Sequence, residues 1–148
     1  MRLYYFAYGS NLDADQMRAR CPSSRVRHPA LLPDHRLAFT HRSSRWGGGA
    51  ADVVAARGET VWGVVYALHP DDIPRLDRFE RGYERIELCV ESPLHARVRA
   101  VSYSVRSKGS YPPTRLYRDK MITWAARHGL PRDYLEKLRS IQTLESSR

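Results

Sequence analysis

Lysine and clustered charge are both scarce in this chain. Lysine accounts for only three of the 25 basic residues, and 16 acidic residues leave a net charge of +9. The remaining basic residues are arginines spread along the sequence, whereas a dedicated nucleic-acid-binding protein more often gathers its positive charge on one segment. We therefore expect a solvated basic surface and no nucleic-acid partner.

Cysteine is also scarce, with Cys21 and Cys89 as the two examples. Two cysteines are too few for a disulfide scaffold, and neither has the spacing of a metal site. The N-terminal residues lack the order of regions that marks a signal peptide, and no apolar run is long enough to span a membrane. These absences predict reduced thiols in a cytoplasmic protein with no membrane partner.

Several common enzyme motifs are missing. The sequence has no GxSxG elbow, no phosphate-binding loop with its lysine and no GxGxxG turn. Its six histidines form no pair at helical spacing, which disfavours a metal enzyme. The chemistry must therefore come from other residues, and we expect it to need no cofactor and no metal.

What is present predicts one domain over residues 1–148, with a mixed α+β fold. Apolar and β-branched runs predict strands, apolar residues at helical spacing predict helices, and three consecutive glycines predict a polar loop. The expected strands are Leu3–Tyr8, His35–Phe39, Glu59–Leu68, Tyr83–Glu91 and Val98–Val105, with a turn at His95–Arg97. The expected helices are Asp13–Arg20, Pro70–Phe79, Thr114–His128 and Arg132–Ile141, and the expected loop is Ser43–Ala51.

The first segment with chemical interest is YFAYGSNL, which ends the first strand and leads into a helix. Ser10 and Asn11 are expected to cap that helix. A strand that turns into a helix through Gly-Ser-Asn exposes unpaired backbone N–H groups, which attract carboxylate or oxyanion oxygens. An aromatic core strand followed by an ordinary capped turn would produce the same pattern.

The second segment is LDRFERGY, in which Glu80 follows Phe79 at the expected end of a helix. A carboxylate drawn into apolar surroundings has a raised pKa and can exchange protons near neutrality. A surface glutamate paired with an arginine would fit the pattern equally well. We interpret the neighbouring Asp77, Arg78, Arg81 and Arg85 as surface or pairing residues.

Together these segments resemble the γ-glutamylcyclotransferase family, which includes AIG2-like proteins. YFAYGSNL is similar to the family's glycine loop, and GETVWGVVYAL followed by LDRFE resembles its central strand and catalytic glutamate. The segment from Pro112 to Ile141 resembles the family's C-terminal region. The three blocks occur in the family's order across nearly the whole chain. The resemblance implies a small mixed β-barrel flanked by helices.

Residue by residue, the resemblance implies that Glu80 is the general acid and base. It also implies that the substrate contacts the loop and a set of tyrosines. These residues are Tyr5, Phe6, Ala7, Tyr8, Gly9, Ser10, Asn11, Leu12, Tyr83, Tyr103 and Tyr117. The implied reaction is closure of a γ-glutamyl group onto its own α-amine, which releases 5-oxoproline and an amine from a γ-glutamyl small molecule.

Two alternatives stay open at this stage. The same substrate-contacting residues could form the pocket of a catalytically silent binding module, or the basic surface could serve an anionic partner. The identity of the leaving amine is open as well, and so is the choice between a monomer and a homodimer.

Overall fold

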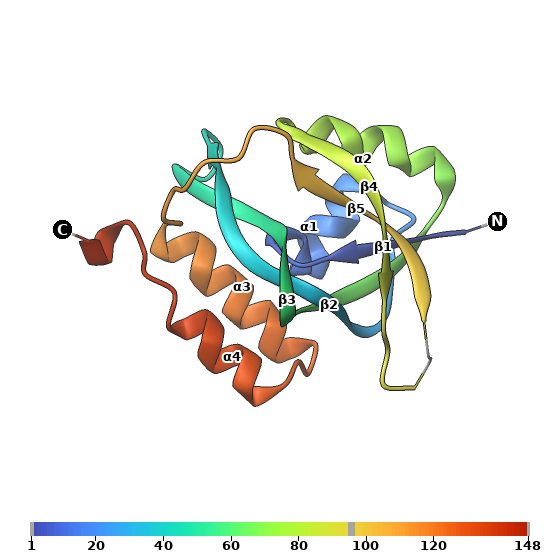
Figure 1. Cartoon of the computed structure of the whole chain (residues 1–148). Coiled ribbons are helices and arrows are strands. Elements are labelled where there is room, and N and C mark those ends of the chain that lie inside the picture. The colour runs from blue at the N-terminus through green and yellow to red at the C-terminus, as the bar shows by residue number, and fades with distance from the viewer. Residues whose placement is uncertain (1, 95–96, 148) are drawn as a thin grey trace.

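The computed structural model describes residues 2–94 and 97–147. In that part of the chain, five strands and four α-helices alternate irregularly (Figure 1). The strands are β1 (Leu3–Ala7), β2 (Arg25–Ser43), β3 (Gly48–Leu68), β4 (Tyr83–Val90) and β5 (Val98–Val105). The α-helices are α1 (Ala14–Arg20), α2 (Ile73–Phe79), α3 (Arg115–Arg127) and α4 (Arg132–Arg139). Residues 95 and 96 of the expected turn His95–Arg97 lie outside the described residues.

The strands form one mixed sheet in the order β2-β3-β1-β5-β4, in which only the β1–β5 pairing is parallel. The sheet curls until its two edges meet. Leu31 of β2 and Glu91, just after β4, exchange two backbone hydrogen bonds of 2.8 Å. The curled sheet encloses a core that includes Phe6, Tyr66 and Leu68. This architecture confirms the expected α+β fold with a mixed barrel flanked by helices.

The second strand is much longer than the expected His35–Phe39. Pro29 and Pro33 did not end it, because β2 is an edge strand whose only extended partner is β3. A proline that lacks an N–H group is tolerated at an edge, where no second neighbour needs that donor. Register shifts between Val26 and His28 and between Pro33 and His35 absorb the irregularity.

The glycine-rich segment is only partly a loop. Gly48–Ala51 belongs to β3, and the turn is confined to the residues between Ser43 and Gly48. Gly49 donates its N–H to the carbonyl of Pro112 at 2.9 Å, and a Cβ at Gly49 would overlap the carbonyl of Tyr111. The glycine therefore allows the segment that precedes α3 to cross closely over β3.

The C-terminal helices cover β2 and β3 from one side, and α1 and α2 lie toward the other (Figure 1). Thr114 caps α3 by accepting the N–H of Tyr117, and Gly129 follows the helix end with a φ of +75°. No helix within residues 2–94 or 97–147 is long and apolar enough to cross a membrane.

Candidate active site

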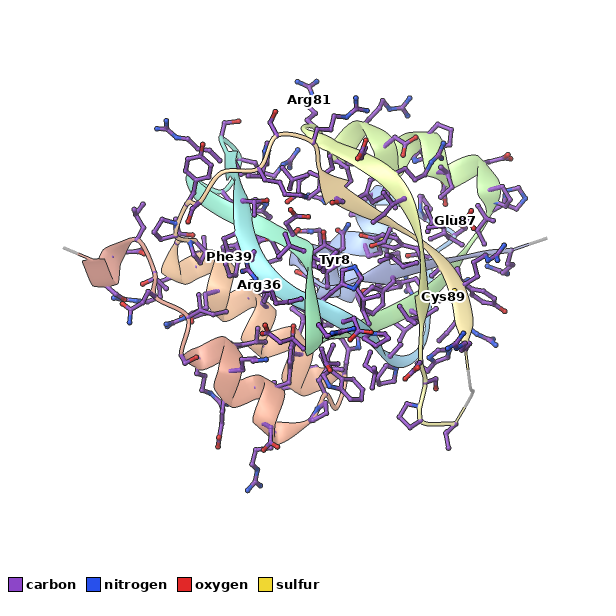
Figure 2. The ribbon with its side chains drawn as sticks, in the orientation of Figure 1. Tyr8, Arg36, Phe39, Arg81, Glu87 and Cys89 are labelled. Carbon is purple, nitrogen blue, oxygen red and sulfur yellow. The ribbon has the colours of Figure 1, made fainter. Side chains whose placement is uncertain are left out.

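A cavity of about 950 Å³ opens where the end of β1, the β2–β3 turn, the end of α2 and the start of α3 meet. Of the residues that the sequence nominates, nine line this cavity: Tyr5, Tyr8, Gly9, Ser10, Asn11, Glu80, Tyr83, Tyr103 and Tyr117. Figure 2 labels Tyr8 inside the curled sheet. The other three, Phe6, Ala7 and Leu12, lie in the buried core beneath it. The structure therefore does not bring them to the cavity wall.

Glu80 stands at the C-terminal cap of α2, with its carboxylate directed to the loop that follows β1. Its Oε1 atom accepts a hydrogen bond of 3.2 Å from Nδ2 of Asn11. Burial raises the pKa of Glu80 to about 7, Arg20 and Arg45 lower it, and Asp77 raises it further. A carboxyl group with this pKa exists in both protonation states near neutral pH, which suits proton transfer in both directions.

Asn11 is the centre of a hydrogen-bond network that fixes the loop. Its amide nitrogen donates to the Tyr5 hydroxyl at 2.9 Å as well as to Glu80, and its Oδ1 accepts from Gln16 at 3.0 Å and from Arg20 at 3.1 Å. Both ends of the side-chain amide are therefore used, which sets its orientation. The network fixes the carboxylate of Glu80 relative to the loop.

The expected cap of α1 is wrong. Asp13 caps the helix by accepting the N–H groups of Asp15 and Gln16, whereas Ser10 and Asn11 lie in a short 3₁₀ turn ahead of it. Because Asp13 satisfies the helix end, the side chain of Asn11 is available to the cavity.

Two tyrosines bind the backbone of one residue of β3, Ala51. The Tyr117 hydroxyl accepts the N–H of Ala51 at 3.0 Å, and the Tyr83 hydroxyl donates to the carbonyl of Ala51 at 2.6 Å. Burial raises the pKa of Tyr117 to about 12, so it is a neutral phenol at pH 7. Since its oxygen accepts the Ala51 bond, its own proton remains for another acceptor.

The other two tyrosine hydroxyls of the wall are also anchored. The Tyr8 hydroxyl donates to the carbonyl of Tyr103 at 2.6 Å, and the Tyr103 hydroxyl donates to Asp77 at 2.5 Å. Asp77 also pairs with Arg85 at 3.5 Å, as the sequence predicts for both residues. These bonds hold the aromatic wall rigid before any ligand arrives.

Sequence reasoning missed Asp52, which lies next to Ala51 and is fully buried. It accepts hydrogen bonds from Thr40 at 2.7 Å, Lys108 at 2.6 Å and the backbone of Val105 at 3.1 Å. A buried carboxylate needs such partners, and here they tie β3 to β2 and to the end of β5. The signal in the sequence is a lone acidic residue within the apolar run AADVVA.

The arginines of the cavity were missed as well. Six line it: Arg20, Arg42, Arg45, Arg75, Arg78 and Arg81. Arg20 is 7% exposed, with its guanidinium 4.8 Å from the centre of the Phe79 ring, and the guanidinium of Arg45 lies 5.7 Å from the same ring. In a chain so rich in arginine, composition and spacing do not single these residues out.

Metal ligands are not grouped in the described part of the chain. Within residues 2–94 and 97–147, no cluster of three or more His, Cys, Asp or Glu side chains could hold a metal ion.

The raised pKa of Glu80 predicts a pH dependence of stability. Between the ordinary carboxyl value of 4.5 and about 7, the folded protein keeps a proton on Glu80 that the unfolded chain has lost. The free energy of unfolding should therefore fall as pH rises through this window, by about 1.4 kcal/mol for each unit of the pKa shift. Urea titrations of the wild type and of Glu80→Gln, compared at each pH, isolate this contribution. A constant difference between the two proteins would contradict it.

The site thus combines a curled mixed sheet with a carboxyl group, Glu80, that faces a Gly-Ser-Asn loop. The chain is also similar in sequence to known proteins. The model of the AIG2-like family matches residues 60–138. The chain is 34% identical to gamma-glutamylcyclotransferase of Mus musculus, over 95% of this chain and 79% of that protein. It is also 34% identical to gamma-glutamylcyclotransferase of Homo sapiens, over 93% of this chain and 78% of that protein.

A solved structure named gamma-glutamyl cyclotransferase superimposes with a TM-score of 0.93 at 32% identity, covering 97% of this chain and 89% of that one. The chain therefore belongs to the γ-glutamylcyclotransferase family, as its sequence motifs predict.

Proposed function

We propose that this protein is a γ-glutamylcyclotransferase, which converts a γ-glutamyl amide into 5-oxoproline and a free amine. The observation that carries the proposal is Glu80, a carboxyl group with a pKa of about 7 that faces the Gly-Ser-Asn loop inside the cavity. A silent binding module in the same cavity would have no use for a carboxyl group held at that pKa.

The reaction is an intramolecular aminolysis. The α-nitrogen of the substrate forms a bond to its own γ-carbonyl carbon, and the original bond between that carbon and the leaving nitrogen breaks. Two protons leave the α-ammonium and two arrive at the leaving nitrogen, so the transfers balance. One carboxylate can carry both protons, because it delivers the first to the leaving nitrogen before it takes the second.

The enzyme's larger task is to hold the substrate in the conformation that closes the ring. We assign the backbone N–H groups of Gly9 and Ser10 to the α-carboxylate or the developing oxyanion, and Glu80 to the α-ammonium. Tyr117, with a proton to donate, adds a contact on the opposite wall. The neutral phenols of Tyr5, Tyr83 and Tyr103 line the rest of the pocket.

Gly9 should tolerate very little additional volume. A Cβ at Gly9 would lie 3.0 Å from the Tyr117 hydroxyl and 3.1 Å from the Cβ of Ala51. We expect Gly9→Val to abolish substrate binding, measured by calorimetry, and Gly9→Ala to weaken it less because the neighbours need to move only slightly. Circular dichroism must show that both variants fold. Unchanged affinity in folded Gly9→Val would remove the loop from the site.

Tyr117→Phe deletes one hydroxyl from the wall. We expect kcat/KM to fall about fivefold or somewhat more, corresponding to about 1 kcal/mol of transition-state binding for one hydrogen bond. Tyr134→Phe is the matched control, because Tyr134 is a buried tyrosine of α4 that lies outside the cavity. If Tyr117→Phe behaved like this control in both kinetics and stability, Tyr117 would be only a core residue.

The direct experiment is to incubate the purified protein with a panel of γ-glutamyl compounds and to measure 5-oxoproline. Formation of 5-oxoproline from at least one compound, with stoichiometric release of the amine, supports the proposal. Binding of γ-glutamyl compounds without any product would favour the silent module.

A cytoplasmic location and a single domain over residues 1–148 are part of the same proposal. The choice between a monomer and a homodimer can be made by light scattering on the full chain.

A further inference from the structure

The charge around the cavity is one-sided. Six arginines line it and Glu80 is the single carboxylate among the lining residues, whereas the whole chain has 25 basic and 16 acidic residues. A concave surface of one charge sign raises the local concentration of ligands of the opposite sign. The substrate that fits this cavity should therefore be more anionic than a γ-glutamyl group alone.

Three of the arginines already have partners. Arg20 donates to Asn11, Arg75 lies 3.7 Å from Asp72 and donates to the carbonyl of Arg20, and Arg45 stacks over Phe79. These contacts give each of them a role in holding the loop and α2 in place.

The other three arginines, Arg42, Arg78 and Arg81, are exposed at the mouth. Within the described residues, no carboxylate lies within 4.0 Å of their guanidinium groups. Arg78 and Arg81 flank Glu80 along the chain, and Arg42 belongs to the end of β2. Figure 2 shows Arg81 extending outward beside the end of α2. We refer to Arg42, Arg78 and Arg81 as the arginine rim.

The arginine rim lies where we expect the leaving amine of the substrate to be. The α-amine must reach Glu80 for the ring to close, and the leaving amine is at the other end of the amide. With the γ-glutamyl group held at the loop and at Glu80, as proposed above, the leaving amine is the part of the substrate left to face the mouth, where the rim lies. A guanidinium group presents a planar fork of donors that matches a carboxylate, and three such groups exceed what one carboxylate can satisfy.

We propose that the leaving amine carries at least two negative charges, and that the rim recognises them. An acidic amino acid, with its α-carboxylate and its side-chain carboxylate, has this chemistry. The inference rests on the proposed cyclotransferase function and specifies its substrate class.

The test compares two nearly isosteric dipeptides, γ-glutamyl-glutamate and γ-glutamyl-glutamine. They differ by one negative charge at the end of the leaving group. We expect kcat/KM to be about tenfold higher for γ-glutamyl-glutamate at low salt, since several exposed ion pairs act together. The preference should shrink as salt is added, because exposed charges are screened.

Substitutions assign the preference to the rim. Each of Arg42→Gln, Arg78→Gln and Arg81→Gln should reduce the ratio of the two kcat/KM values, and the triple variant should bring it close to one. Arg36→Gln is the matched control, since Arg36 is an exposed arginine of β2 outside the cavity (Figure 2). The control should keep the wild-type ratio.

A binding measurement tests the preference for an anionic leaving group separately from the cyclotransferase function. The dissociation constants of both dipeptides are measured on Glu80→Gln, which needs no turnover. Tighter binding of γ-glutamyl-glutamate that is lost in the rim variants supports the inference, even if no 5-oxoproline forms and the cyclotransferase function fails. Equal affinities and equal kcat/KM values, with 5-oxoproline formed from both, would overturn the inference and leave the function intact. A preference that survives in the triple variant would also overturn it.

Discussion

Replacing Glu80 with glutamine is expected to lower kcat by two or more powers of ten while leaving the fold intact. Glutamine keeps an oxygen that can accept the hydrogen bond from Asn11 and preserves the size of the side chain. It removes the group that exchanges protons, and general acid–base catalysis contributes roughly two to four powers of ten to enzymatic rates. The loss should appear mainly in kcat, because the proton moves only during the chemical steps.

The matched control is Glu84→Gln, which removes an exposed carboxylate of β4 outside the cavity. Its kcat should equal that of the wild type. The wild-type rate should rise as pH increases through about 7, where Glu80 becomes a base, and Glu80→Gln should lack this rise. Normal turnover by Glu80→Gln on any accepted substrate would show that the proton is carried by another group.

The second large effect concerns the substrate. Acetylation of the α-amine should stop turnover completely, because the amide nitrogen that results is no longer a nucleophile. A change of the leaving amine should alter the rate only by degree, since that nitrogen departs and does not attack. The measurement is product formation from the acetylated and the free γ-glutamyl compound under identical conditions. Consumption of the acetylated compound at a comparable rate would mean that water attacks the γ-carbonyl.

The sequence was informative where the site is built from neighbouring residues. The strand, turn and helix around Gly9 are contiguous in the sequence, and Glu80 directly follows the last residue of α2. Local sequence patterns therefore predicted the positions of both the loop and Glu80. The strands Tyr83–Glu91 and Val98–Val105 were predicted nearly to the residue because alternating apolar side chains mark a half-buried strand.

The sequence was uninformative where the site depends on the closure of the sheet. Tyr117 reaches Ala51 across 66 residues, and Lys108 reaches Asp52 across 56. Neither contact leaves a local pattern. The long β2 was missed for a related reason: Pro29 and Pro33 argue against a strand unless it is known to lie at an edge.

The sequence also could not show which residues of the segment YFAYGSNL face the cavity. The resemblance nominated every residue from Tyr5 to Leu12, but a strand and a tight turn direct some side chains into the core. Phe6 lies fully buried against Gly63, and Leu12 is also buried. Only the three-dimensional path of the backbone separates these residues from Tyr5 and Asn11.

In the proposed reaction the substrate's own amine, and not water, attacks the γ-carbonyl. A γ-glutamyl dipeptide carrying a heavy nitrogen isotope in its α-amine, incubated with the enzyme in water enriched in heavy oxygen, tests this by mass spectrometry. We expect 5-oxoproline that retains the heavy nitrogen and contains no heavy oxygen. Glutamate with heavy oxygen in its γ-carboxylate as the first product would contradict it.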